Sequence, residues 1–206
     1  MLSDMSKWSN RGDIMVDLVV CGVGGQGIVL ISRVLARAAL LSGLHVTVSE
    51  VRGLAQREGS VSSHIRIGDH GSLTIAEGKA DAVVSMELVE AARNLRYLRE
   101  GGVVVSNDYV RYHIPHYLGI SKFPEREDLI KMIGKHRAYL VNARKIAESL
   151  GNIRVVNSVM LGAVYSTGVL PFSLKEITDA ISESVPEKYR DVNISAFKLG
   201  MEAVRP

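Results

Sequence analysis

Hydrophobic and polar residues in the first fifty positions follow two periods, one typical of strands and one typical of helices. The apolar run IMVDLVVC at 14–21 predicts a buried strand. IVLISRVLARAALLSG at 28–43 repeats apolar residues at helical spacing and ends at Gly43. LHVTVSE at 44–50 alternates and is β-branched, which predicts a second strand. Such a strand–loop–helix–strand unit is typical of a parallel sheet.

A polar, glycine-punctuated stretch at 51–60 interrupts this regular alternation, and we expect a loop or a short irregular helix there. Residues 62–67 then predict a strand, 69–71 a turn, and SLTIA at 72–76 the antiparallel hairpin partner of that strand. The parallel pattern resumes afterwards, with a strand at 81–86, an amphipathic helix at 87–100 and a strand at 103–108.

The last third of the chain carries mainly helical patterns. Asn142 is predicted to cap the helix RKIAESLG, and Ser173 with Glu176 forms a capping box at the start of another helix. NSVMLGAVYSTG at 157–168 is apolar nearly all round, which predicts a buried helix. The other expected elements are a helix from about residue 125, a strand at 138–143 and a C-terminal helix at 192–204.

These elements predict a single α/β domain over residues 13–206, preceded by a flexible N-terminal extension at 1–12. We expect a mostly parallel sheet flanked by helices, a Rossmann-like three-layer arrangement with an inserted antiparallel hairpin. The length of 206 residues suits one domain with a core of ordinary size.

Composition narrows the class of protein. A balance of 47% hydrophobic and 23% charged residues is normal for a globular chain, and a net charge of +3 without long basic runs argues against a nucleic-acid partner. The single cysteine, Cys21, cannot by itself hold an iron–sulfur cluster or a structural zinc. The polar N-terminus and the lack of any apolar run near 20 residues predict a cytoplasmic protein without a membrane partner.

The turn CGVGGQG, between the first strand and the first helix, contains the strongest candidate chemistry. Its spacing Gly22-x-Gly24-x-x-Gly27 matches a dinucleotide-binding loop, where free N–H groups at a helix start donate hydrogen bonds to phosphate. Glu50 follows Gly27 by 23 residues, where such folds place a ribose-binding acid. A stand-alone NAD- or FAD-binding oxidoreductase is therefore one hypothesis, and a purely structural turn is another.

Two features disfavour the dinucleotide hypothesis. Gln26 places a large amide at the loop apex, in space that a pyrophosphate needs, and the polar stretch after Glu50 replaces the expected helix. Both polar segments leave carboxyl ends of strands, which form one edge in a parallel sheet. The sequence therefore predicts that the glycine loop and the stretch 51–60 share an interface or ligand-binding edge.

At these segments the chain resembles a known family. GVGGQGIVLISRVLARAALLSG and VTVSEVRGLAQREGSVSSHIRIG are similar to the γ-type subunit of 2-oxoacid:ferredoxin oxidoreductases, closest to the β subunit of the indolepyruvate enzymes. The likeness runs in order from residue 15 to about 204. One departure is Glu58, where the family usually has glycine. Matching positions in the C-terminal half are Asn157, Leu161 to Ala163, Gly168, Leu170-Pro171, Val185 to Lys188, Asn193, Ala196-Phe197 and Gly200.

The resemblance implies a division of labour. Such enzymes convert a 2-oxoacid, CoA and oxidised ferredoxin into acyl-CoA, CO2 and reduced ferredoxin. Thiamine diphosphate, magnesium and iron–sulfur clusters are implied on a large partner subunit, and this chain is implied to bind none of them alone. It is expected to be an accessory subunit that completes the active-site cavity, inactive in isolation. Contact with CoA, a homodimer of the isolated chain, and a pure assembly role without any ligand are left open.

The resemblance implies no catalytic or metal-binding role for the residues at this edge of the sheet. The glycines shape the loop, and Gln26 offers its amide to a partner, to CoA or to its own loop. A guanidinium group can bind phosphate or carboxylate through two parallel hydrogen bonds. The arginines are therefore candidates for binding a CoA phosphate or a carboxylate of a partner. The alternative is that they form surface salt bridges. The predicted binding residues are Gly22, Gly24, Gly25, Gln26, Gly27, Arg52, Gln56 and Arg57.

Overall fold

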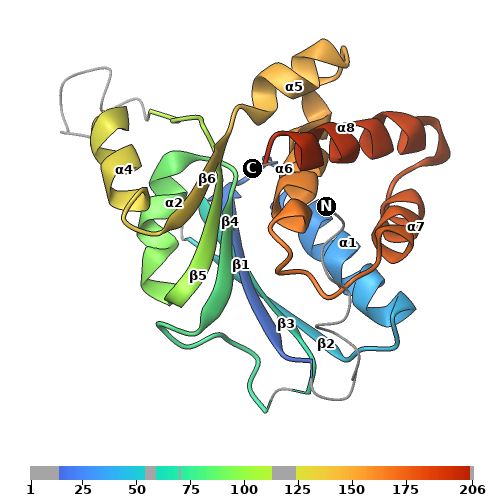
Figure 1. Ribbon diagram of the computed structural model, residues 1–206, viewed down its shortest axis with the longest axis horizontal. Coiled ribbons are helices and arrows are strands. Elements are labelled where there is room, and N and C mark those ends of the chain that lie inside the picture. Colours follow the sequence, from blue (N-terminus) through green and yellow to red (C-terminus); the bar gives the residue numbers. More distant parts are fainter. Residues whose placement is uncertain (1–13, 54–58, 70, 113–123, 205–206) are drawn as a thin grey trace.

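The computed structural model describes residues 14–53, 59–69, 71–112 and 124–204, and the predicted extension at 1–12 lies outside them. Six strands form one sheet in the order β2-β3-β1-β4-β5-β6 (Figure 1). β1, β4, β5 and β6 are parallel, whereas β3 is antiparallel to both of its neighbours. The strands are β1 Val16–Val23, β2 Val46–Arg52, β3 Ser60–Ile67, β4 Ala80–Ser85, β5 Leu98–Asn107 and β6 Arg137–Val141.

Helices cover both faces of the sheet, which confirms the predicted α/β fold class (Figure 1). The larger layer contains α1 Ile28–Leu41, α5 Ala143–Ser149, α6 Val156–Ser166, α7 Leu174–Ser184 and α8 Arg190–Glu202. The smaller layer contains α2 Leu88–Asn94 and α4 Arg126–Ile133. Short 3-10 turns are η3 Leu95–Tyr97, η4 Ile153–Val155 and η5 Glu187–Tyr189. Among the described helices, none combines the length and the apolar character that crossing a bilayer requires.

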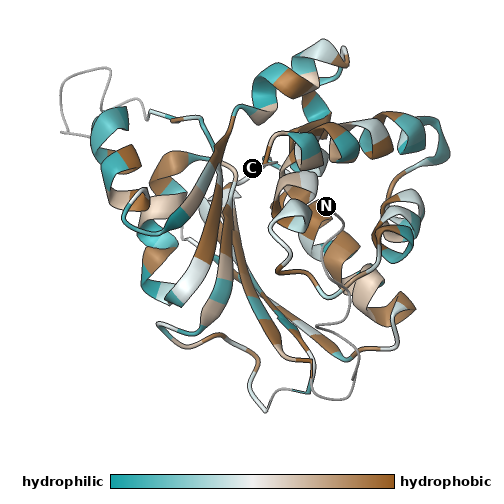
Figure 2. Cartoon of the chain, viewed as in Figure 1, coloured by the Kyte–Doolittle hydropathy of each residue, from teal (hydrophilic) through white to brown (hydrophobic). Residues whose placement is uncertain are grey.

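The central strand β1 is buried along its whole length because each of its faces packs against a different helical layer. Leu18 and Val20 belong to the larger apolar cluster, and Val19 and Cys21 belong to the smaller one. Successive side chains of a strand point to opposite faces, so β1 contributes alternate residues to two apolar cores. Figure 2 shows the result, with hydrophobic strands at the centre and hydrophilic residues on outward helix surfaces.

The antiparallel insertion is present, but its predicted pairing is wrong. β3 pairs with β2 and β1, and residues 72–76 form no strand. Those residues instead lie against β3 through side chains, since the N–H of Ile75 donates to His64 Nδ1 at 3.1 Å. Arg66 donates to the carbonyl of Thr74 at 3.2 Å. Pairing with two long strands satisfies the whole backbone of β3 in a way that a five-residue hairpin partner could not.

The predicted helix at 87–100 is also too long. α2 ends at Asn94, and the strand β5 already begins at Leu98, which pairs with Ala80. Arg99 makes an ion pair with Asp81 of β4 at 2.7 Å. Tertiary pairing with β4 thus overrides the helical period of this segment.

Local signals in the C-terminal half are confirmed. The Ser173 capping box is complete, and the side chain of Asn142 accepts the N–H of Lys145. α6 is buried, and it crosses α8 very closely. A Cβ on Gly162 would lie 1.9 Å from the carbonyl oxygen of Phe197, so only glycine permits this crossing.

Candidate functional site

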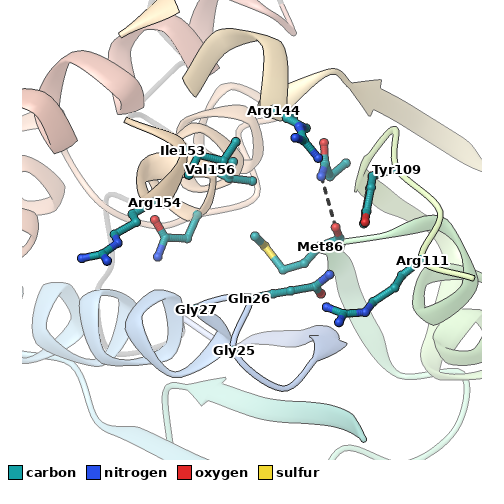
Figure 3. Close-up of a pocket in the computed structure, with 12 residues that line it drawn as sticks. Gly25, Gln26, Gly27, Met86, Tyr109, Arg111, Arg144, Ile153, Arg154 and Val156 are labelled. Carbon is teal, nitrogen blue, oxygen red and sulfur yellow. Dashed lines mark hydrogen bonds between the residues drawn. The ribbon is translucent and has the colours of Figure 1, made fainter. Parts of the chain in front are cut away.

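A pocket opens at the carboxyl ends of β1 and β4, the two adjacent strands from which the chain leaves toward opposite faces of the sheet. In open α/β sheets, ligands bind in the crevice at such a switch point. Its volume is about 530 Å³, which is the size of a ligand pocket. The residues that line it, drawn in Figure 3, are Gly25, Gln26, Gly27, Met86, Asn107, Tyr109, Arg111, Arg144, Ile153, Arg154, Val156 and Asn157.

The glycine loop forms one wall of this pocket, and Gln26 folds back onto it. The N–H of Val23 donates to Gln26 Oε1 at 2.7 Å. A Cβ on Gly22 would lie 2.6 Å from that same oxygen, so the first glycine of the motif makes room for the amide. The Gln26 amide therefore bonds its own loop, which is one of the three uses expected for it from the sequence.

Gly25 and Gly27 both have left-handed backbones, with φ of 90° and 86°. Gly27 is the N-cap of α1 and lines the pocket, so the first helical turn, whose N–H groups have no partner within the helix, begins at the pocket wall. Asn157 of α6 packs directly on Gly27, since a Cβ there would lie 2.4 Å from Asn157 Nδ2. The loop is thereby held between β1 and the start of α6.

The structure brings together only some of the predicted residues. Gly25, Gln26 and Gly27 line the pocket, whereas Gly22 and Gly24 support the loop behind it. Arg52 ends the edge strand β2, with an ion pair to Glu50 at 2.7 Å, and is not among the lining residues. Gln56 and Arg57 lie outside the described residues.

The glycine loop does share an edge of the sheet with the stretch between β2 and β3. The N–H of Gly24 donates to the carbonyl of Gly59 at 3.0 Å, and the N–H of Gly53 donates to Ser60 at 2.9 Å. The first bond joins the loop after β1 to the end of that stretch, and the second joins the two ends of the stretch to each other. The described ends of the stretch 51–60 therefore lie beside the glycine loop.

The dinucleotide hypothesis needs β2 beside β1, and this arrangement is absent because β3 lies between them. At the usual strand spacing, Glu50 is displaced from β1 by two strands, or roughly 10 Å. Its carboxylate also already faces Arg52. Glu50 is thus removed from the position in which an acid of a dinucleotide-binding fold reaches a ribose.

Three arginines that the sequence interpretation missed lie around the pocket: Arg111, Arg144 and Arg154. Figure 3 shows their side chains on separate walls, with Arg111 extending toward Gln26. Arg144 is paired with Glu148 at 2.8 Å, and this hydrogen bond raises the pKa of the Arg144 guanidinium. The Arg154 side chain makes no hydrogen bond or ion pair with the described residues.

Arg111 follows β5, whereas Arg144 and Arg154 lie more than thirty residues later, on the neighbouring elements α5 and η4, so no single local motif contains all three. The available signal for Arg111 and Arg144 was their position just after predicted strands, at the same edge of the sheet, whereas Arg154 lies between two predicted helices and carried no such signal. Asn107 joins these walls, since its Nδ2 donates to the carbonyl of Met86 at 3.2 Å and its Oδ1 accepts the N–H of Ala143 at 3.1 Å.

The electrostatic character of the pocket is cationic. Guanidinium groups stay charged throughout the physiological range. No carboxylate side chain is among the described residues that line the pocket. The apolar side chains of Met86, Ile153 and Val156 share the walls with the arginines. The pocket therefore suits an anionic ligand, such as a phosphate ester, that also carries an apolar part.

Other reactive side chains lie elsewhere or are buried. His64 is buried in β3, where its Nδ1 accepts a backbone N–H, and burial lowers its pKa. Cys21 is fully buried, and burial raises the pKa of its thiol. Within the described ranges, no three or more His, Cys, Asp or Glu side chains group as metal ligands would. The arginine-lined pocket is thus the candidate functional site.

Comparison with known proteins shows which family and which proteins this chain is similar to. Residues 17–203 match the pyruvate ferredoxin/flavodoxin oxidoreductase family. Indolepyruvate oxidoreductase subunit IorB of Thermococcus kodakarensis is 39% identical over 196 residues, which covers 92% of this chain and 96% of that protein. The subunit of the same name from Archaeoglobus fulgidus is 38% identical over 189 residues, with coverage of 90% and 93%.

A solved structure shares the fold at similar coverage. The keto/oxoacid ferredoxin oxidoreductase gamma subunit from Geobacter sulfurreducens superposes with a TM-score of 0.69 and 26% identity. The match covers 92% of this chain and 98% of that subunit.

Proposed function

This chain belongs to the pyruvate ferredoxin/flavodoxin oxidoreductase family, and from that premise we propose that it is the accessory subunit of a thiamine-diphosphate-dependent 2-oxoacid:ferredoxin oxidoreductase. The complex would oxidatively decarboxylate an arylpyruvate or a related 2-oxoacid to an acyl-CoA. The names of the relatives at 36–39% identity support the arylpyruvate type, since two 2-oxoglutarate synthase subunits are 28% and 30% identical.

The role of this chain is to complete the active-site cavity of a large partner subunit and to contact CoA. The observation that carries the proposal is the arginine-lined pocket at the switch point of the sheet. CoA has phosphate groups at one end and an apolar pantetheine arm, which matches guanidinium and apolar lining. Thiamine diphosphate, magnesium and the iron–sulfur clusters belong to the partner subunit in this proposal, and ferredoxin is reached through the complex.

The division of labour is tested by assembling the chain with its large subunit. Co-expression should yield a brown complex that contains thiamine diphosphate and iron and that reduces ferredoxin in the presence of 2-oxoacid and CoA. The isolated chain should give no turnover under the same conditions. Turnover by the isolated chain, or failure of the chain to copurify with a cluster-containing subunit, would contradict the proposal.

The CoA contact is tested by Arg154→Ala in the assembled enzyme. Loss of a charged hydrogen bond at an exposed site should raise the KM for CoA roughly 10-fold, with little change in the KM for the oxoacid. Arg96→Ala is the matched control, because Arg96 lies before β5, at the opposite end of the sheet from the pocket. Equal KM values for CoA in both variants would leave this chain with an assembly role only.

A further inference from the structure

A buried carboxyl group, Glu87, lies directly behind the pocket and is not one of the residues that line it. It follows β4 and is only 1% exposed. Its two oxygens accept backbone N–H groups from two different segments. Oε1 accepts the N–H of Glu90 in α2 at 2.8 Å, and Oε2 accepts the N–H of Arg111 after β5 at 3.3 Å.

The second of these bonds ties the pocket wall to the start of α2. Arg111 lines the pocket, and its neighbour Tyr109, which also lines it, accepts the N–H of Leu88 at 2.8 Å. Residues 87 and 88 therefore hold the stretch 109–111 through one side-chain bond and one backbone bond. The Glu87 bond therefore fixes the backbone at Arg111, in addition to the anchor that the Tyr109 carbonyl gives this stretch on α2.

We propose that Glu87 is a positioning residue that holds Arg111 in the pocket for its anionic ligand. The inference rests on the proposed function, in which that ligand is CoA. Glu87 acts only through the backbone of Arg111, so it affects how tightly the ligand is held and leaves the chemical step unchanged.

A carboxylate is specifically suited to this position. It has two acceptor oxygens and no donor, whereas glutamine would turn an N–H₂ donor toward one of the two N–H groups. Burial makes the charge costly, and desolvation raises the pKa of Glu87. The same carboxyl group caps the seven-residue helix α2 and bonds the stretch after β5, so its place in the structure goes beyond capping that helix.

The groups around Glu87 define what a change of pH does. Glu90 faces it from α2 and is itself engaged by Arg93 at 2.6 Å and by the hydroxyl of Ser60 at 2.6 Å. The buried thiol of Cys21 faces it from β1. When Glu87 takes up a proton as the pH falls through its raised pKa, one oxygen becomes a donor, and Arg111 loses its anchor. Ligand affinity should therefore fall with that protonation.

The test uses the full chain assembled with its large subunit and measures kcat and the KM for CoA. Arg111→Ala should raise this KM roughly 10-fold through the loss of a charged hydrogen bond. Glu87→Gln should raise it several-fold with kcat unchanged, and the double variant should be no worse than Arg111→Ala alone. Val104→Ala is the control for destabilisation, because it shortens a buried side chain in the apolar cluster that includes residues of α2. Val104 does not line the pocket.

Each outcome separates the two proposals. If Arg111→Ala leaves the KM for CoA unchanged, the proposed CoA contact of this site fails. If Arg111→Ala raises the KM while Glu87→Gln does not, or if the two effects add, the positioning role is overturned and the CoA contact stands. An increase in Val104→Ala equal to that in Glu87→Gln would likewise overturn it.

A pH profile keeps the inference testable even if Glu87→Gln does not assemble. In the wild type, the KM for CoA should rise as the pH falls through the Glu87 pKa. Arg111→Ala should lack this component, while it keeps the change that stems from the titration of CoA itself. Identical profiles in the wild type and in Arg111→Ala would refute the positioning role.

Discussion

Gly27→Ala should destabilise this protein clearly more than Gly25→Ala, although both glycines belong to one loop and have the same kind of backbone. Their φ angles are 86° and 90°, so an alanine is strained at either position. The surroundings differ, since nothing lies within 4 Å of a Cβ on Gly25, whereas a Cβ on Gly27 would lie 2.4 Å from Asn157 Nδ2. The pair therefore separates backbone strain from steric crowding.

The expected loss in the free energy of unfolding is the sum of a backbone cost and a steric cost. A left-handed backbone costs an L-residue roughly 1–2 kcal/mol, which should be the whole loss at Gly25. Overpacking against a buried side chain adds about 1–3 kcal/mol, so Gly27→Ala should lose about 2–5 kcal/mol. For a chain of this size, each kcal/mol corresponds to about 2–4 °C in Tm.

Equilibrium denaturation in urea measures both losses, and a double-mutant cycle identifies the partner. In an Asn157→Ala background, Gly27→Ala should cost about 1 kcal/mol less than in the wild type, because its steric partner is gone. The Gly25→Ala loss should be the same in both backgrounds. Equal losses for the two glycines, or a Gly27→Ala loss that does not depend on Asn157, would refute the crowding of the loop by α6.

Three further predictions concern the fold. Gly162→Ala should lower the free energy of unfolding by about 1–3 kcal/mol in urea titrations, because α6 must move away from the Phe197 carbonyl; an unchanged midpoint would contradict this contact. Burial lowers the pKa of His64 below 6.5, so the unfolded state binds a proton that the folded state does not, and stability should fall as the pH drops below about 6.5. His64→Gln should flatten that slope. Cys21 is fully buried, so iodoacetamide should label it only after unfolding, and rapid labelling of the native chain would disprove its burial.

Signals that act over a few residues were readable in advance. The capping box at Ser173, the Asn142 cap and the apolar helix at 157–168 each depend on neighbours within one or two turns, and each is present. The glycine loop was likewise recognised, because its spacing and its place between a strand and a helix are local properties. The alternation of strand and helix patterns extended this to the α/β fold class.

Pairing between distant segments was harder to predict. β3 could satisfy its backbone with either a following segment or two earlier strands, and the pattern of side chains is the same in both cases. The segment that begins at Leu98 had a helical period, yet pairing with β4 made it a strand. Both errors arose because hydrogen-bond partners far along the chain decided between conformations that the local pattern favours about equally.

The sequence by itself determined most of the elements that form, where most of them begin, and that a glycine loop precedes the first helix, because propensity, capping and periodicity act over short distances. Only the tertiary structure decided that β3 separates Glu50 from that loop and that Arg111, Arg144 and Arg154 surround one pocket. Those residues lie on separate segments, and the order of strands in the sheet, which no local interaction specifies, brings their charges together.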